Sequence, residues 1–399
     1  MLRSVSLVMV SLLVWACGGN DGDESSPSGG SSGGGSAGTA GAAGGGTGGT
    51  AGGSTGGSGG SGGGITPGDV IDAPNETWTW VPFADSACGN GSPTGIAISK
   101  TSRSDKLLLF LNGGGACWDQ LTCDTLNLAS YINTGFGEAD ATQSFGTLGG
   151  TGIFNRDNPD NPFADYSFVF VPYCTGDVHA GDNPNAPDGK AHVGYLNVGA
   201  FLNRVVPTFA KASQVVLSGA SAGGFGVLMN YDRVARAFGS SVPVVLLDDS
   251  GPPMAPQYLT ESLQTSTLVT AWNSLVHLPE GCPDVGVGKM ENVYECLSTL
   301  YPDGRFGLLV SEQDQVIRSF YGYGLQQFPM NAAAFQEGLY DVASRLEKLD
   351  RWRYYFIAGD KHTWVGDEPV GGTTVSGVKI TDWMRGLRDG STDWSNVSP

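Results

Sequence analysis

The stretch that decides the fold is VVLSGASAGG, residues 215–224. Its apolar start leads into Gly219-Ala220-Ser221-Ala222-Gly223, which fits the pattern Gly-x-Ser-x-Gly. Residues 222–238 then carry apolar side chains at helical spacing. A sharp strand-to-helix turn of this kind exposes the serine hydroxyl, and only small neighbours fit it. The stretch predicts a nucleophile at Ser221; the alternative interpretation is a glycine-rich helix start.

Other apolar runs and helical patterns alternate along the chain. Uninterrupted apolar runs indicate strands that are covered on both faces. They occupy residues 106–111, 168–171, 215–217, 244–247, 306–310 and 354–357, and helical patterns occupy 194–212, 222–238 and 331–350. This alternation predicts an α/β-hydrolase-like α/β fold with a mostly parallel sheet covered by helices on both faces. Ligands bind at the carboxyl ends of such strands, so we expect the chemistry there.

Composition divides the chain into three parts. Residues 1–17 resemble a lipoprotein signal peptide, with Arg3, a short apolar run and a lipobox-like end at Ala16-Cys17. The alternative is ordinary cleavage nearby, with Cys17 lost or left free. Residues 18–69, rich in Gly, Ser and Thr, predict a disordered linker. Residues 70–399 are long enough for one large α/β domain.

The net charge and the amino-terminal features limit the cellular locations and the binding partners to be expected. The net charge of −18 argues against nucleic acid and against charge-driven binding to anionic membranes. We expect an exported monomer without cofactors. It would be secreted or lipid-anchored at the bacterial cell envelope or surface, and its only contact with the membrane would be a lipid on Cys17.

The cysteines support export. Apart from Cys17 there are six, and an even number in an exported domain predicts three disulfides. Many pairings of six cysteines are possible, so the sequence leaves the pairing open. The chain contains no Cys-x-x-Cys, which argues against zinc, and no metal site is predicted.

The general base must come from four histidines. In α/β-hydrolases the triad residues follow in the order serine, acid, histidine, which leaves His277 and His362. His362 stands in a strand-end loop after the run at 354–357, whereas His277 sits in an apolar stretch and is interpreted as packed. We therefore predict that His362 is the base.

Three aspartates compete for the role of the acid. Asp248, Asp249 and Asp314 all follow predicted strands between the serine and the histidine. The alternative for each is a helix cap or a solvated loop residue. The position of Asp314 after the later strand gives it a modest lead.

A glycine run predicts the oxyanion hole. The strand at 106–111 ends in Asn112-Gly113-Gly114-Gly115-Ala116, where backbone N–H groups can approach a developing oxyanion. We predict Gly114 and Ala222 as donors, with Gly113 beside them. The alternative is a plain tight turn.

Taken together, these motifs resemble the pectin acetylesterase/Notum family of carboxylesterases. The matching segments, in the family order, are LFLNGGGACW (109–118), FVFVPYC (168–174), GASAGG (219–224), NYDRV (230–234), DSG (249–251) and KHTW (361–364). They span roughly residues 78–365.

The resemblance implies a triad of Ser221, Asp314 and His362, with Asp249 as a structural residue near the site. It also implies the disulfides Cys88–Cys174, Cys117–Cys123 and Cys282–Cys296. The chain departs from the family at Asn112, where glutamate is common, and near Gly115 and Ala116, where an aromatic residue is common. Small residues there are expected to reshape the acyl pocket.

Several further residues are candidates for substrate contact. Asp177 and His179 could touch substrate or bind a metal; the alternative is a loop held by Cys174. His192 is expected to order a loop. Aromatic side chains could stack on sugars or simply pack near the pocket. The candidates for substrate contact are Trp118, Tyr173, Asp177, His179, Asp249 and Trp364.

The sequence thus predicts a serine carboxylesterase that removes acyl groups, first of all acetyl, from a polysaccharide such as pectin through an acyl-enzyme. Because pectin is polyanionic and the chain is acidic, a neutral glycan such as xylan or a small ester is an alternative. A second alternative is an esterase for longer acyl chains, including those on lipid-modified proteins, which needs a wide apolar pocket that the sequence does not reveal. A third is a non-catalytic glycan-binding surface protein, which would be expected to lack Ser221, His362 or the glycines.

Overall fold

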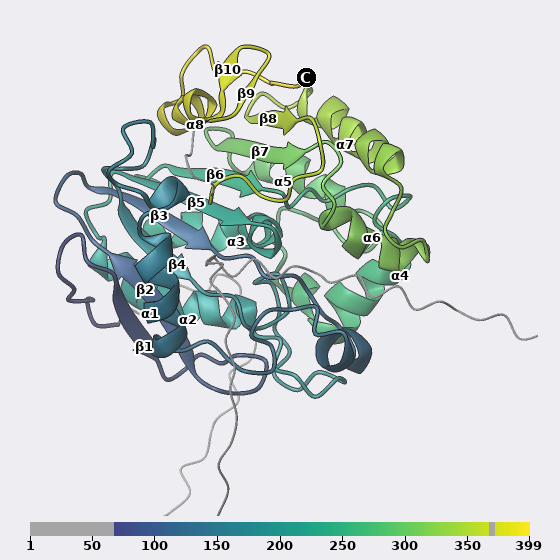
Figure 1. The fold of residues 1–399 in the computed structure, drawn as a ribbon, viewed down its shortest axis with the longest axis horizontal. Coiled ribbons are helices and arrows are strands. Elements are labelled where there is room, and N and C mark those ends of the chain that lie inside the picture. Colours follow the sequence, from purple (N-terminus) through teal and green to yellow (C-terminus); the bar gives the residue numbers. More distant parts are fainter. Residues whose placement is uncertain (1–67, 367–371) are drawn as a thin grey trace, which may run out of the picture. The chain divides into compact units, whose positions relative to one another are not determined.

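The centre of the fold is an eight-stranded sheet with the order β1-β2-β4-β3-β5-β6-β7-β8 (Figure 1). The computed structural model describes residues 68–366 and 372–399. Strand β2 is antiparallel to β1 and β4, and all later pairings are parallel. The strands are β1 Thr79–Phe83, β2 Thr94–Ser99, β3 Lys106–Leu111, β4 Ser167–Val171, β5 Gln214–Ala220, β6 Val244–Asp249, β7 Arg305–Ser311 and β8 Trp352–Ile357, with a separate pair β9 Thr374–Val375 and β10 Val378–Lys379. The predicted α/β class and mostly parallel sheet are confirmed.

Helices connect the strands and cover the sheet. The α-helices are α1 Glu138–Leu148, α2 Gly194–Thr208, α3 Ala222–Phe238, α4 Glu261–Gln264, α5 Val293–Leu300, α6 Ile317–Leu325, α7 Ala332–Leu346 and α8 Ile380–Asp389. Short helical turns are η1 Leu121–Thr125, η2 Gly152–Phe154, η3 Thr265–Ala271, η4 Ser274–His277 and η5 Met290–Asn292.

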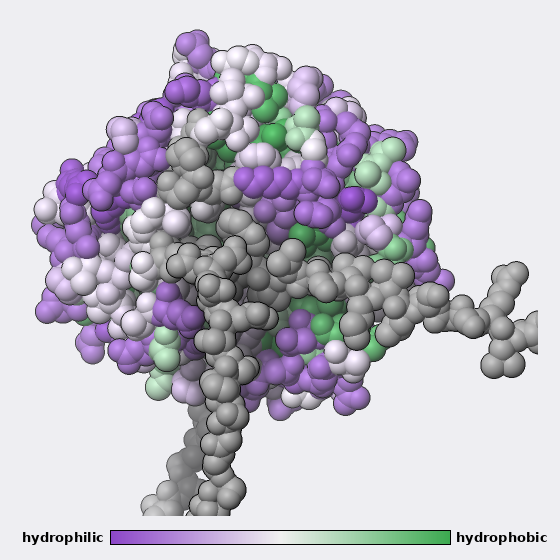
Figure 2. All heavy atoms as spheres, in the orientation of Figure 1, coloured by the Kyte–Doolittle hydropathy of each residue, from purple (hydrophilic) through white to green (hydrophobic). Residues whose placement is uncertain are grey.

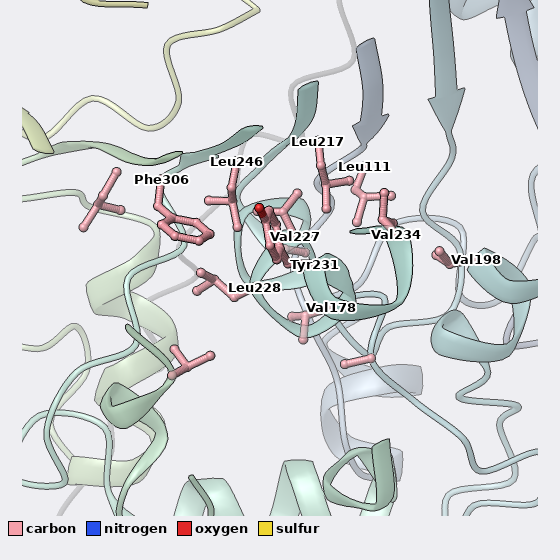
Figure 3. Packing of buried hydrophobic residues seen from close by; sticks show 14 of the residues in the cluster. Leu111, Val178, Val198, Leu217, Val227, Leu228, Tyr231, Val234, Leu246 and Phe306 are labelled. Carbon is pink, nitrogen blue, oxygen red and sulfur yellow. The ribbon is translucent and has the colours of Figure 1, made fainter. Parts of the chain in front are cut away.

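The inner strands are buried on both faces. Val215 and Leu217 of β5 belong to the core shared with α2, α3 and α7, whereas Val216 between them belongs to the core shared with α8. This alternation follows from the opposite directions of successive side chains in a strand. Figure 3 shows Leu217 facing Val227 and Tyr231 of α3. Burial on both faces explains why these strands read as uninterrupted apolar runs.

The observed helix ends refine the predicted ranges. Helix α3 covers residues 222–238, as predicted, but α2 ends at Thr208 rather than residue 212. Pro207 lies in the last turn of α2 and cannot donate to the carbonyl of Asn203. The N–H of Gly68 donates to that carbonyl instead, at 2.7 Å. Helix α7 begins after Asn331, whose side chain accepts two N–H groups of the first turn.

Three disulfides cross-link the domain, in the same pairs that the resemblance implies. They join Cys88 to Cys174, Cys117 to Cys123 and Cys282 to Cys296, over sequence separations of 86, 6 and 14 residues. By loop-closure entropy these would stabilise the fold by about 4–5, 2 and 3 kcal/mol respectively.

The predicted signal peptide, Cys17 and the linker up to residue 67 lie outside the described residues. Within the described part of the chain, no helix combines the length and the apolar character needed to cross a bilayer.

Candidate active site

Ser221 occupies the turn between β5 and α3. Its backbone has φ 58° and ψ −120°, a conformation that is strained for a residue with a side chain. The neighbouring backbones approach too closely for larger residues. A Cβ atom on Gly219 would lie 2.2 Å from the carbonyl oxygen of Gly223, and one on Gly223 would lie 1.9 Å from that of Leu111. The glycines of the motif are therefore required by packing around the serine.

Asp314 and His362 form a hydrogen-bonded pair. Nδ1 of His362 lies 2.8 Å from Oδ2 and 3.0 Å from Oδ1 of Asp314, whose carboxylate is fully buried. The same Oδ1 accepts the N–H groups of Val316 and Ile317, both at 3.0 Å, where α6 begins. The helix start thus fixes the carboxylate, and the carboxylate in turn orients the imidazole.

The loops that carry Asp314 and His362 bind each other directly. The N–H of Gln313 donates to the carbonyl of Gly359 at 2.9 Å, and the N–H of Gln315 donates to that of Asp360 at 3.0 Å. The hydroxyl of Ser311 donates to the carbonyl of Lys361. These contacts continue the pairing of β7 with β8 beyond the end of the sheet.

Asp249 links the serine turn to the histidine loop. Its carbonyl accepts the N–H of Ser221 at 2.7 Å, and its Oδ2 accepts the N–H groups of Trp364 and Val365 at 2.7 and 2.8 Å. Burial raises the pKa of Asp249 to about 6, although these donors act in the opposite direction. No hydrogen bond joins Ser221 Oγ to His362 in this structure; the ring is bonded to Asp314.

The glycine run packs against the serine turn. We call residues 112–115 the oxyanion turn. A Cβ atom on Gly113 would lie 2.6 Å from the carbonyl oxygen of Ala220 and 2.9 Å from Cβ of Ser221. Among the described residues, the N–H groups of Gly114 and Ala222 have no hydrogen-bond acceptor. The arrangement offers backbone donors beside the serine, as an oxyanion hole requires.

Ser221 lines an apolar cavity of about 110 Å³. Figure 2 shows hydrophobic surface between the positions of α3 and α4, the helices that flank this cavity. The cavity could not be predicted from the sequence, because its walls combine segments whose apolar residues are each typical of a core. The lining includes Gly115, Ala116, Trp118, Val178, Phe225, Leu228, Met229, Leu259, Leu263, Leu268, Trp272, Met290, Val293, Ile317 and Phe320.

Of the predicted substrate-contact residues, only Trp118 lines the cavity. The other five are no more than 9% exposed, and their side chains bond within the protein. None of the five lines the cavity, so substrate contact by them stays a prediction. These five are Tyr173, Asp177, His179, Asp249 and Trp364.

The other two histidines lie away from the cavity. His277 Nε2 is 2.8 Å from Oδ2 of Asp182, and its ring stacks on Tyr195 at 3.9 Å between centroids. His192 lies in the group of described residues close enough together for a metal ion, with Cys117 and Cys123. The two sulfur atoms of that group are bonded to each other, so neither is a free thiolate ligand.

Comparisons with known proteins agree with this architecture. The family model for pectinacetylesterase matches residues 78–299, more than half of the chain. The palmitoleoyl-protein carboxylesterase notum2 of Xenopus laevis is 32% identical over 216 residues, which cover 49% of this chain and 42% of that protein. The palmitoleoyl-protein carboxylesterase NOTUM of Homo sapiens is 33% identical over 152 residues, covering 37% and 30%. The chain thus spans less than half the length of these relatives.

Proposed function

This chain belongs to the pectinacetylesterase family, and from that premise we propose that it is a serine carboxylesterase with Ser221 as nucleophile. His362 is the general base and Asp314 orients it. The observation that carries the proposal is that Ser221 both occupies a strained strand-to-helix turn and lines an apolar cavity. Such a serine can attack an ester whose acyl chain enters the cavity.

The proposed reaction proceeds through an acyl-enzyme. Nδ1 of His362 donates to Asp314, which leaves Nε2 to take the proton of Ser221 as the hydroxyl attacks the ester carbonyl. The N–H groups of Gly114 and Ala222 stabilise the oxyanion, and His362 returns the proton to the leaving alcohol. Water then hydrolyses the acyl-enzyme with the same groups. No step requires a cofactor.

The volume of the cavity bounds the acyl group. An apolar cavity of about 150 Å³ holds a molecule of the size of benzene. In proportion, a cavity of about 110 Å³ would hold about four carbon atoms. We therefore propose a short to medium aliphatic acyl chain: acetyl fits but leaves the cavity largely empty, and a palmitoleoyl chain needs the walls to move.

On the alcohol side we propose a carbohydrate or a small alcohol. Trp118 is partly exposed where it lines the cavity, so it is available to stack on a sugar ring. The net charge of −18 favours a neutral glycan over polyanionic pectin. For the location we propose export and a lipid on Cys17, which labelling of the protein with radioactive palmitate would test.

Hydrolysis of p-nitrophenyl esters tests the function. We expect the highest kcat/KM for butyrate and hexanoate, a lower value for acetate and the lowest for palmitate. Ser221→Ala should abolish all turnover and leave the circular dichroism spectrum unchanged. Acetate release from acetylated pectin, xylan and chitin would identify the alcohol. Turnover that survives Ser221→Ala would exclude this site.

A further inference from the structure

The turn that follows β4 has an unusual backbone. Val178 and His179 are consecutive residues with positive φ, 50° and 58°. This region is uncommon for any residue with a side chain, and a β-branched residue in it is an outlier. Such conformations persist only where the surroundings hold them, and they cluster at functional sites. The surroundings of this turn must therefore hold it in place.

Buried hydrogen bonds hold the turn on every side. The N–H of His179 donates to Oδ1 of Asp177 at 3.1 Å, and its carbonyl accepts Nδ2 of Asn230 at 2.9 Å. The N–H of Val178 donates to the hydroxyl of Tyr173 at 2.9 Å. Asp177, Asn230 and Tyr173 are at most 1% exposed. Bonds of this kind are costly to break where water cannot replace them, so the backbone of His179 is rigid.

The side chain of His179 contacts the oxyanion turn. Its Nε2 lies 2.8 Å from the carbonyl oxygen of Asn112. A carbonyl oxygen can only accept, so Nε2 carries the hydrogen. Burial lowers the pKa of His179, which keeps the ring neutral. Helix α3 makes room for the ring at Gly226, where a Cβ atom would lie 3.2 Å from Cδ2 of His179.

The hydrogen bond from His179 to the carbonyl of Asn112 fixes the orientation of the peptide at the start of the glycine run. In a planar trans peptide the C=O and N–H point in opposite directions, so a fixed carbonyl of Asn112 also fixes the N–H of Gly113. Gly113 lies directly against Ser221, as described above. Tyr173 supports the next residue: a Cβ atom on Gly114 would lie 2.7 Å from Cδ1 of that ring. His179 and Tyr173 are themselves in contact, with ring centroids 4.9 Å apart.

We propose that His179 is a positioning residue that fixes the oxyanion turn through the carbonyl of Asn112, and so holds the backbone donors in place for the oxyanion. The inference rests on the proposed esterase function. It assigns a role to a residue for which the sequence pointed to substrate contact. His179 does not touch the substrate; it acts through Asn112.

Replacement of the imidazole N–H tests the proposal. Loss of an oxyanion-hole donor costs on the order of 10²–10³ in rate, and loosening the turn should cost less, roughly 10- to 100-fold in kcat. We expect this loss in His179→Leu on p-nitrophenyl butyrate, with little change in KM, because the oxyanion forms only in the transition state. His179→Gln, whose amide N–H reaches a similar position, should restore most of kcat.

His192 provides the matched control. It is also fully buried, and its Nδ1 lies 2.6 Å from a carbonyl oxygen, that of Thr175, while its Nε2 bonds Asp188. It makes no bond to residues 112–115. His192→Gln should therefore lower the melting temperature without changing kcat of the folded enzyme.

The outcomes separate the proposals. A kcat of folded His179→Leu within twofold of wild type, or a loss that His179→Gln does not restore, would overturn the positioning role. If His179→Leu does not fold, His179→Asn is the second variant, because its amide stops short of the Asn112 carbonyl and should show the same loss. Activity that persists in Ser221→Ala would instead refute the esterase site itself.

Discussion

The carboxylate of Asp249 accepts the backbone N–H of Trp364 at 2.7 Å. Because the carbonyl of Asp249 also accepts the N–H of Ser221, one residue at the end of β6 determines the spacing between the serine turn and the loop of His362. Trp364, which Asp249 contacts, lies two residues after His362 in the sequence. Asp249 itself is fully buried. These contacts hold the two loops in register.

Asp249 makes the stability of the fold depend on pH. Its pKa is raised from 3.8 to about 6, so the protonated carboxyl is the form that the fold favours. This contribution to stability is full below about pH 4 and is lost as the pH rises through 6. At about 1.4 kcal/mol per pKa unit, the change is roughly 3 kcal/mol. We expect Asp249→Asn, which does not titrate, to lack this decline in urea unfolding measured from pH 4 to 7; an identical slope in both proteins would contradict the assignment.

Asp314 serves the histidine and the start of α6, and two substitutions separate these roles. Asp314→Asn keeps an oxygen for the N–H groups of Val316 and Ile317 but no longer stabilises the imidazolium. We expect kcat to fall by about 10³–10⁴-fold with little change in melting temperature. Asp314→Ala should lose the same activity and, in addition, about 1 kcal/mol of stability through the missing cap. Equal melting temperatures for the two variants would show that the cap contributes nothing.

Leu268 and Val269 test the acyl cavity as a matched pair. Leu268 lines the cavity and is 8% exposed, whereas its neighbour Val269 is 46% exposed. Leu268→Trp should fill the cavity and shift preference from hexanoate towards acetate, at an overpacking cost of about 1–3 kcal/mol. Val269→Trp should leave the chain-length profile unchanged. The profile is measured with p-nitrophenyl esters, and an unchanged profile in Leu268→Trp would place the acyl chain elsewhere.

Much of the fold was predictable because burial leaves a simple pattern. The central strands lie between two layers of helices, so each reads as a continuous apolar run, as at Leu107–Leu111. The first two strands escaped prediction because Pro82 interrupts the apolar pattern of β1 and Gly95 that of β2; these two residues pair with each other at the edge of the sheet. Proline is tolerated there because an edge strand has one side without ladder bonds.

The site was predictable in part, for a related reason. Chain order and strand ends pointed to His362 and Asp314, and the structure brings these two together. The cavity could not be predicted, because Leu228, Leu268 and Phe320 come from separate segments, and nothing in one segment indicates that they face a space rather than a neighbour. The same limit applies to His179, because nothing in the sequence indicates that its ring meets the carbonyl of Asn112.

The largest share of the cavity wall comes from the connection between β6 and β7, including Leu259, Leu263, Leu268, Met290 and Val293. The proposed nucleophile Ser221, the proposed acid and base, and the oxyanion turn all stand on other connections. On the proposed function, the preference for acyl-chain length and the catalytic reaction therefore depend on different segments of the chain. In a chimaera, residues 253–293 are replaced by those of a relative and Cys282 is retained. We expect this protein to show the acyl-chain-length preference of the relative and to keep its own catalytic residues.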